Sequence, residues 1–248
     1  MSKHVFTKPF TQQESIPEAG IERAVEIMRS GRLHRYNLAG DEASEASCLE
    51  REYAIWQGAD YCLACSSGGY AIQLALRVCG VVPGDKVLAN AYTLAPVPGA
   101  IHNVGAVPVL VDIDENYHID CDDLDAKAKV SGAKVLLLSH MRGHIADMDR
   151  VVEICNAHNI CLIEDCAHSL GSLLNEKHTG LFGDAGVYSL YATKAIPVGE
   201  GGIIVTKDAD LYKKAKKFII YDRFDQQLDV GINMRMSEIN ALLSYSVL

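Results

Sequence analysis

The stretch AKVLLLSHMRGHIADMDRVVEICNAHNICLIED, residues 133–165, decides the fold class of this chain. It holds two apolar runs of strand length, 133–140 and 160–165, and between them a segment with helical apolar spacing, 148–159. Continuous apolar strands that alternate with amphipathic helices are typical of a mainly parallel sheet covered by helices on both faces. The stretch therefore predicts a three-layer α/β/α fold.

The same alternation extends outward from this stretch in both directions. The further strands that we expect are 61–66, 85–90, 107–114, 185–190 and 201–206. The helices that we expect are 16–31, 41–58, 70–80, a segment running through Ala100, 208–220 and 236–248. The chain has neither a fixed-period repeat nor a linker, and we divide it into an N-terminal helical segment, 1–30, and one large domain, 31–248.

Composition and charge exclude several classes of protein. The chain has 248 residues, 49% of them apolar and 22% charged, as in ordinary globular domains. Its net charge of −9 disfavours nucleic acid as a partner. No apolar run approaches the ~20 residues of a membrane span, and the N-terminal residues MSKHVFTKPFTQQESIPEAG lack the apolar core of a secretory signal. These features predict a cytoplasmic protein without a membrane anchor.

The cysteines point to structural roles. Eight of them are irregularly spaced, which fits a reducing compartment. The one CxxC pair, Cys62 and Cys65, lies in an expected strand, where an offset of three places side chains on opposite faces. We therefore expect buried thiols at this pair and no metal site.

Polar residues follow the expected strands, where sheets of this class bind their ligands. They are 66–69 (SSGG), 90–92 (NAY), Asp112, His140, 165–168 (DCAH) and the run from Ser189 to Lys194. The SSGG turn before a helix is either an ordinary tight turn or an anion site built from free main-chain N–H groups. The chain contains neither GxGxxG nor GxxxxGK[ST], so no nucleotide fingerprint decides between them.

Two charged residues at strand ends complete a possible site. Asp165 ends a buried strand, so its carboxylate needs a partner: an arginine, a helix N-terminus or a protonated ring nitrogen. Lys194 lies in a mostly apolar stretch and either extends to solvent or stays desolvated as a free amine, which forms a Schiff base with an aldehyde. An anion cradle, a carboxylate for a ring nitrogen and an isolated lysine together match pyridoxal 5′-phosphate.

The chain from about Phe10 onward resembles the DegT/StrS sugar aminotransferases, which are pyridoxal-phosphate enzymes of fold type I. The matching stretches, in order, are SSGGYAIQLAL, PGDKVLANAYT, GAVPVLVDID, GHIADMDRVVEICNAHNICLIEDCAHSLGS, GLFGDAGVYSLYATKAIPVGEGGIIVT and GINMRMSEINALL. The resemblance implies that 31–248 is the cofactor-binding large domain. It also implies that Lys194 binds the cofactor aldehyde and moves a proton during catalysis. Asp165 would pair with the pyridine nitrogen, and His168 would lie near the ring hydroxyl.

The resemblance also implies a phosphate site and a dimer. Gly68, Gly69 and Ser189 would hold the phosphate, with the N–H groups of Gly69 and Tyr70 as donors. Asn233 matches an asparagine that reaches the phosphate of the neighbouring subunit, which implies a homodimer with shared sites.

The sequence departs from the family pattern at several positions. Gly69 stands where the family usually has threonine or serine, and Tyr191 where it usually has histidine. Leu94 replaces an aromatic residue that stacks on the cofactor ring, so either Leu94 or Tyr92 is expected to cover that ring. The family continues into a smaller C-terminal domain, which we expect to be absent or truncated here because the sequence stops at Leu248.

The function implied by the resemblance is transamination. An amino acid, glutamate or glutamine, would give its amino group to a keto group of a nucleotide-linked sugar or a cyclitol, in polysaccharide or antibiotic biosynthesis. The alternatives are another fold-type-I reaction, either dehydration or aminohydroxybenzoate synthesis, and a truncated non-catalytic homologue that binds the cofactor or a partner subunit. Lys194 counts against the dehydratases, which carry histidine there. A Rossmann-type binding domain is disfavoured by the absence of GxGxxG.

Overall fold

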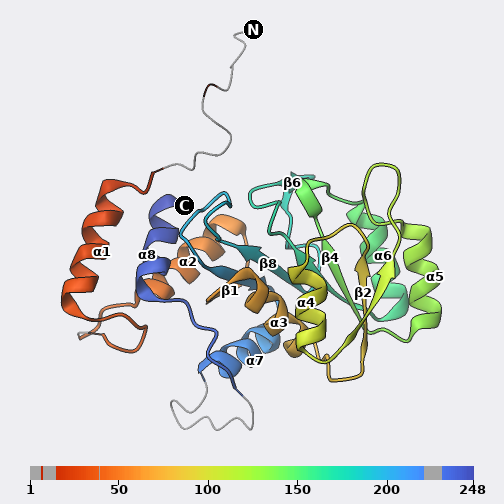
Figure 1. Ribbon diagram of the computed structural model, residues 1–248, viewed down its shortest axis with the longest axis horizontal. Coiled ribbons are helices and arrows are strands. Elements are labelled where there is room, and N and C mark those ends of the chain that lie inside the picture. The colour runs from red at the N-terminus through yellow and green to blue at the C-terminus, as the bar shows by residue number, and fades with distance from the viewer. Residues whose placement is uncertain (1–6, 8–14, 39, 221–230) are drawn as a thin grey trace.

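Seven strands form one sheet in the middle of the molecule (Figure 1). The computed structural model describes residues 7, 15–38, 40–220 and 231–248. In spatial order the strands are β1 (Tyr61–Cys65), β9 (Gly202–Thr206), β8 (Ala185–Ser189), β5 (Cys161–Asp165), β4 (Val135–Ser139), β2 (Lys86–Asn90) and β3 (Val107–Val111). Neighbours from β8 to β3 are parallel, whereas β9 is antiparallel to both β1 and β8.

Helices cover both faces of this sheet. One face packs against α3 (Gly68–Val78), α4 (Pro96–Asn103) and α7 (Ala209–Ile220). The other face packs against α2 (Glu45–Gln57), α5 (Cys121–Ser131), α6 (Met148–His158) and α8 (Glu238–Val247). Successive residues of a strand point into opposite cores, as Leu136 and Leu137 of β4 do. The expected three-layer α/β/α fold with a mainly parallel sheet is confirmed.

The stretch 133–165 forms the expected strand–helix–strand unit. The Asp147 side chain caps α6 by accepting the Arg150 N–H. Asn159 ends the helix in the left-handed conformation, with φ of 53°. After β4 the chain makes the short 3₁₀ turn η1 (Met141–Gly143). Local capping signals thus set both ends of the connection between β4 and β5.

Three features of the fold go beyond the sequence expectations. Helix α5 begins after Asp120, whose side chain accepts two main-chain N–H groups, and ends at Gly132. A small hairpin, β6 (Leu173–Leu174) and β7 (Lys177–His178), follows β5. The third feature is the antiparallel direction of β9. The sequence did not predict it, because an apolar run such as GIIVT fits either direction of a buried strand.

The cysteines are all free thiols. Cys65 packs in the core under α3, and Cys62 packs in the core under α2 and α8. The expectation that this pair lies on opposite faces of a strand is therefore confirmed.

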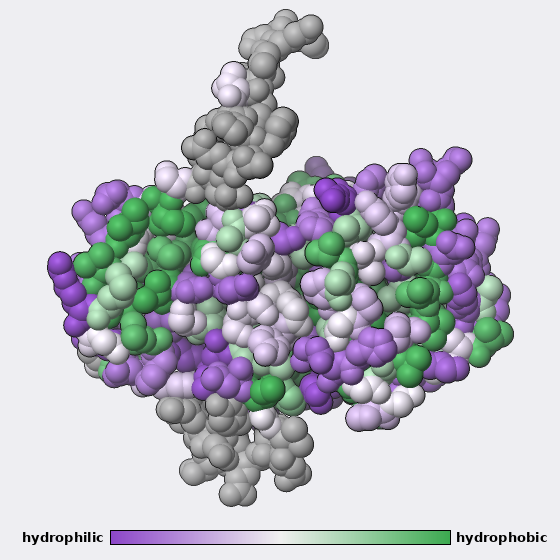
Figure 2. Space-filling view, in the orientation of Figure 1, coloured by the Kyte–Doolittle hydropathy of each residue, from purple (hydrophilic) through white to green (hydrophobic). Residues whose placement is uncertain are grey.

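Helix α1 (Glu18–Ser30) packs on α8 at one end of the molecule (Figure 1). Leu242 of α8 is buried against Ala24 and Ile27 of α1. Figure 2 shows apolar side chains gathered over these two helices. On α1, Ile21 and Met28 are 42% and 53% exposed. Most of the N-terminal segment before α1, including Phe10, lies outside the described residues. None of the helices within the described ranges has the length and apolar character needed to cross a membrane.

Candidate active site

A cavity of about 530 Å³ opens beyond the carboxyl ends of the central strands. Its wall includes the N-terminus of α3, the turn after β2, the residues after β5 and the loop after β8. Seven of the residues predicted from the sequence line it, namely Gly68, Gly69, Leu94, Asp165, His168, Ser189 and Lys194. Tyr70, Tyr92 and Asn233 are not among its lining residues.

The N-terminus of α3 offers main-chain donors to this cavity. Ser67 caps the helix, and its Oγ accepts the Tyr70 N–H at 3.2 Å. The N–H groups of Gly68 and Gly69 donate to no acceptor within the described part of the chain. These two N–H groups, at the positive end of the helix dipole, are therefore available to an anion. The Tyr70 N–H, which we expected to be a donor, is already occupied by the cap.

The two glycines differ in the space around them. A Cβ on Gly68 would lie 2.8 Å from Ser189 Cβ, so the loop approaches β8 too closely for a side chain. A Cβ on Gly69 would meet only Ser67 Oγ, at 4.0 Å. Gly68 is thus required by packing against Ser189, whereas position 69 has room for a larger residue.

Asp165 presents a carboxylate to the cavity without a cationic partner. Its Oδ2 accepts the Ser139 hydroxyl at 2.5 Å, and its Oδ1 accepts the Ala167 N–H at 3.1 Å. Among the described residues no arginine, lysine or histidine forms an ion pair with it. Two of the partners considered for this buried carboxylate were an arginine and a helix N-terminus. Neither of them pairs with it in the described part of the chain. A protonated ligand group in the cavity could do so.

Glu164, the preceding residue, is fully buried on the other face of the sheet. It accepts the N–H groups of Gly180, Phe182 and Gly183 at 2.7–2.9 Å, and one oxygen lies 3.0 Å from His140 Nε2. Glu164 therefore anchors the turn before β8 to β5. The two adjacent carboxylates thus have separate tasks, and of the two only Asp165 lines the cavity.

Lys194 and His168 line the same cavity as Asp165, and the pKa of each is shifted there. Burial lowers the pKa of the Lys194 amine, while the Asp165 carboxylate opposes that shift. Burial lowers the pKa of His168, and the charge of Lys194 lowers it further. His168 Nδ1 accepts the Arg142 N–H at 3.3 Å. A neutral His168 that accepts at Nδ1 carries its proton on Nε2.

Leu94, not Tyr92, lies at the cavity. Leu94 is 47% exposed and forms part of the wall together with Val97. The Tyr92 ring instead contacts Tyr117, with centroids 5.2 Å apart. Asn233 is exposed and lies before the bridge that pairs Arg235 with Cys65.

Ser139 and Thr93 were not predicted from the sequence to belong to the site. Thr93 Oγ1 donates to Ser139 Oγ at 2.8 Å, and Ser139 donates in turn to Asp165. The available signal was only that polar residues end two neighbouring strands. Serine and threonine are common at such positions, so their types alone did not indicate a network.

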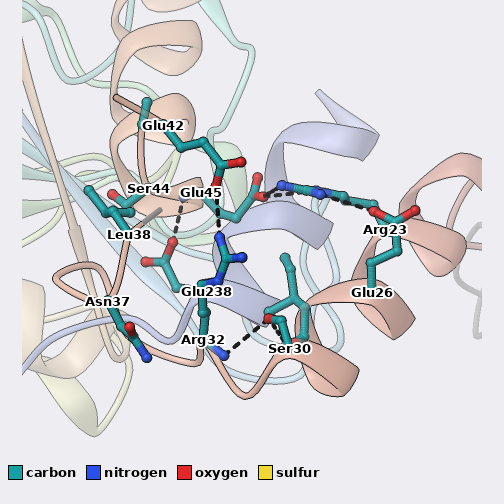
Figure 3. Close-up of a pocket in the computed structure, with 12 residues that line it drawn as sticks. Arg23, Glu26, Ser30, Arg32, Asn37, Leu38, Glu42, Ser44, Glu45 and Glu238 are labelled. Atoms are coloured by element: carbon teal, nitrogen blue, oxygen red, sulfur yellow. Dashed lines mark hydrogen bonds and ion pairs between the residues drawn. The ribbon is translucent and has the colours of Figure 1, made fainter. Parts of the chain in front are cut away.

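A second cavity, of about 210 Å³, lies between α1, α2 and α8 (Figure 3). Arg23 reaches from α1 to Glu45 of α2 at 3.0 Å, and Arg32 pairs with Glu42 at 2.9 Å. Glu238 of α8 accepts the Glu45 N–H at 2.5 Å, and burial raises the pKa of this carboxyl. These contacts join the three helices, and none of the predicted site residues lies among them.

The model of the DegT/DnrJ/EryC1/StrS aminotransferase family matches residues 15–248. GDP-perosamine synthase from Escherichia coli O157:H7 is 32% identical over 206 residues, which cover 81% of this chain and 56% of that protein. The structure of 3-amino-5-hydroxybenzoic acid synthase superimposes with a TM-score of 0.87 at 31% identity, over 96% of this chain and 62% of that one. The PLP form of Spr1654 from Streptococcus pneumoniae gives a TM-score of 0.83 at 26% identity, over 98% and 66%. The chain thus spans less than two thirds of each of these proteins.

Proposed function

Because this chain belongs to the DegT/DnrJ/EryC1/StrS aminotransferase family, we propose that it is a pyridoxal 5′-phosphate-dependent aminotransferase. It takes the amino group of glutamate or glutamine and delivers it to a keto group of a nucleotide-linked sugar or a cyclitol. The observation that carries this proposal is that Asp165, His168, Lys194 and the free N–H groups of α3 line one cavity. The likeness to a GDP-perosamine synthase supports a nucleotide-linked sugar as one class of acceptor.

The residues around the cavity fit the cofactor. The Gly68 and Gly69 N–H groups, beside Ser189, form an anion cradle that a Cβ at position 68 would disturb. Asp165, which has no cationic partner among the described residues, suits a protonated ring nitrogen. Lys194, with its lowered pKa, suits an aldehyde. When bound, pyridoxal phosphate supplies a ring that accepts electrons from the substrate Cα.

Each side chain has a separate task in the reaction. Lys194 Nζ would hold the cofactor through its aldehyde and, as a free amine, would take the proton from the substrate Cα. Asp165 would keep the ring nitrogen protonated. His168 would donate its Nε2–H toward the ring hydroxyl, because the Arg142 N–H occupies Nδ1. Leu94 would lie against the ring and exclude water from it.

The wider organisation follows from the same reasoning. We assign residues 31–248 to the cofactor-binding large domain. Asn233 is exposed and does not line the cavity. By the family resemblance it would reach the phosphate of a neighbouring subunit, and we therefore propose a homodimer with shared sites. The free state of all eight cysteines favours the cytoplasm as the compartment.

The proposal is tested by trapping the cofactor. The protein is incubated with pyridoxal phosphate, reduced with borohydride and digested, and the labelled peptide is identified by mass spectrometry. The label is expected on Lys194 in the native chain and in a control variant of the exposed Lys207, Lys207→Ala, and it is expected to be lost in Lys194→Ala. Label spread over surface lysines, and unchanged in Lys194→Ala, would contradict the proposal.

Glutamate added before reduction separates the enzyme from a non-catalytic homologue. Transfer of its amino group to the cofactor leaves no aldehyde to trap, so the Lys194 label is expected to decrease. If neither glutamate nor glutamine lowers the amount of label on Lys194, the non-catalytic alternative is favoured.

A further inference from the structure

The turn after β2 is held to β4 by a side chain instead of the main chain. The paired residues of these strands run from Val87 and Val135 to Ala89 and Leu137, and no further. Beyond them Asn90 Oδ1 accepts the Ser139 N–H at 2.8 Å, and Asn90 Nδ2 donates to the Ser139 carbonyl at 3.1 Å. The buried amide therefore replaces the next main-chain pair and lets the β2 main chain turn away.

The same amide also fixes the start of the turn. Asn90 Nδ2 makes a second bond, to the Tyr92 carbonyl at 2.8 Å. The next residue, Thr93, then lies where its hydroxyl donates to Ser139 Oγ at 2.8 Å. Leu94 follows directly and forms part of the cavity wall. The position of Leu94 and the hydrogen bond from Thr93 to Ser139 thus depend on the buried Asn90.

The hydroxyl chain ends on the carboxylate that faces the cavity. Ser139 donates to Asp165 Oδ2 at 2.5 Å while it accepts from Thr93. The Ala167 N–H holds the other oxygen, Oδ1, at 3.1 Å. With both oxygens tethered the carboxylate has a fixed plane, and its orientation toward the cavity is set by these two hydrogen bonds. Ser139 and Asp165 are 6% and 8% exposed, so bulk water contributes little to this orientation.

We propose that Ser139, supported by Thr93 and Asn90, is a positioning residue that holds the Asp165 carboxylate in a fixed orientation, aimed at the cofactor ring nitrogen. This inference rests on the proposed function. It assigns no chemical step to Ser139, which acts only through Asp165. The other titratable groups around the carboxylate are Lys194 and His168 at the cavity and Glu164 and Cys166 beside it in the chain.

The test compares Ser139→Ala and Thr93→Val with a matched control. Ser244→Ala also removes a buried serine hydroxyl, one that donates to the Asn240 carbonyl in α8, where it is remote from the cavity. The affinity for pyridoxal phosphate is measured by titration. The visible absorbance of the bound cofactor is then followed against pH.

Ser139→Ala is expected to weaken cofactor binding about tenfold, the effect of losing one charge-assisted hydrogen bond. It is also expected to move the midpoint of the absorbance titration to higher pH. The reason is that a ring nitrogen whose partner, the Asp165 carboxylate, is poorly held withdraws less electron density from the rest of the cofactor. Thr93→Val, nearly isosteric, should shift both readouts less and in the same direction. Combined with Ser139→Ala it should add almost nothing, since both changes break one chain of hydrogen bonds.

The outcomes separate this inference from the function on which it rests. If the native chain fails to label at Lys194, the proposed function falls and this inference with it. If Lys194 labels normally but the Ser139→Ala titrations superimpose on those of Ser244→Ala, only the positioning role is overturned. Should Ser139→Ala fail to fold, Thr93→Val decides, and behaviour identical to the native chain overturns the role.

Discussion

The two adjacent glycines at the start of α3 should respond to alanine in opposite directions. In Gly68→Ala the new Cβ would lie 2.8 Å from Ser189 Cβ and 3.2 Å from Ser189 Cα. These atoms belong to β8, whose pairing with β9 continues to Ser189 and Gly202, so they cannot yield by rotating a side chain. Overpacking of this kind costs about 1–3 kcal/mol.

Gly69→Ala provides the matched control. The nearest atom to its Cβ would be Ser67 Oγ at 4.0 Å, so it introduces no overlap. Replacing glycine by alanine in a helix stabilises by up to about 0.5–1 kcal/mol, a gain that both variants share. The free energies of unfolding of the two variants should therefore differ by about 1–3 kcal/mol, with Gly68→Ala the less stable.

Urea unfolding followed by circular dichroism measures this difference, and cofactor titration measures its consequence at the site. We expect Gly68→Ala to bind pyridoxal phosphate at least tenfold more weakly, since the cradle and Ser189 must separate. Gly69→Ala should bind within a few-fold of the native chain. Equal stability and equal cofactor affinity in the two variants would refute the packing argument for position 68.

Two further predictions concern Glu164 and His168. Glu164→Ala leaves three main-chain N–H groups and His140 without their acceptor, so urea unfolding should show a loss of about 3–5 kcal/mol, whereas Glu153→Ala on the exposed side of α6 should change little. Because the folded pKa of His168 lies below its unfolded value, the unfolded state binds the proton first, and this residue's contribution to the unfolding free energy should fall as pH drops through about 6.5. His168→Gln should flatten that part of the stability–pH profile, and an unchanged profile would show that another group is responsible.

The fold could be predicted from the sequence wherever apolar residues dominate an element. The strands of 133–165 are continuous apolar runs, so their burial and the connecting helix followed from pattern alone. Helix α5, CDDLDAKAKVS, buries few residues and carries a weak apolar pattern, although Asp120 and Gly132 marked its ends. The direction of β9 depends on its neighbours, which a strand pattern does not encode.

The candidate site shows the same division. Asp165 and Lys194 could be singled out because a charged residue at the end of an apolar run needs an explanation. Ser139 could not, because its importance comes from bonds to residues that are far away in the sequence, such as Thr93. The capped state of the Tyr70 N–H likewise depends on the orientation of Ser67, which no pattern specifies.

The antiparallel β9 has a consequence for how the length of the segment that carries Lys194 can vary. The segment that carries Lys194 leaves the sheet at Ser189 and returns at Gly202, its direct partner, and the Leu190 N–H still donates to the Gly201 carbonyl at 2.9 Å. Between parallel neighbours the same segment would have to cross a whole face of the sheet. Here it is a loop whose two ends are paired with each other in β8 and β9. Doubling the length of such a loop costs only about 0.6 kcal/mol. Insertions on either side of the lysine can therefore reshape the cavity while strand order and core stay as they are.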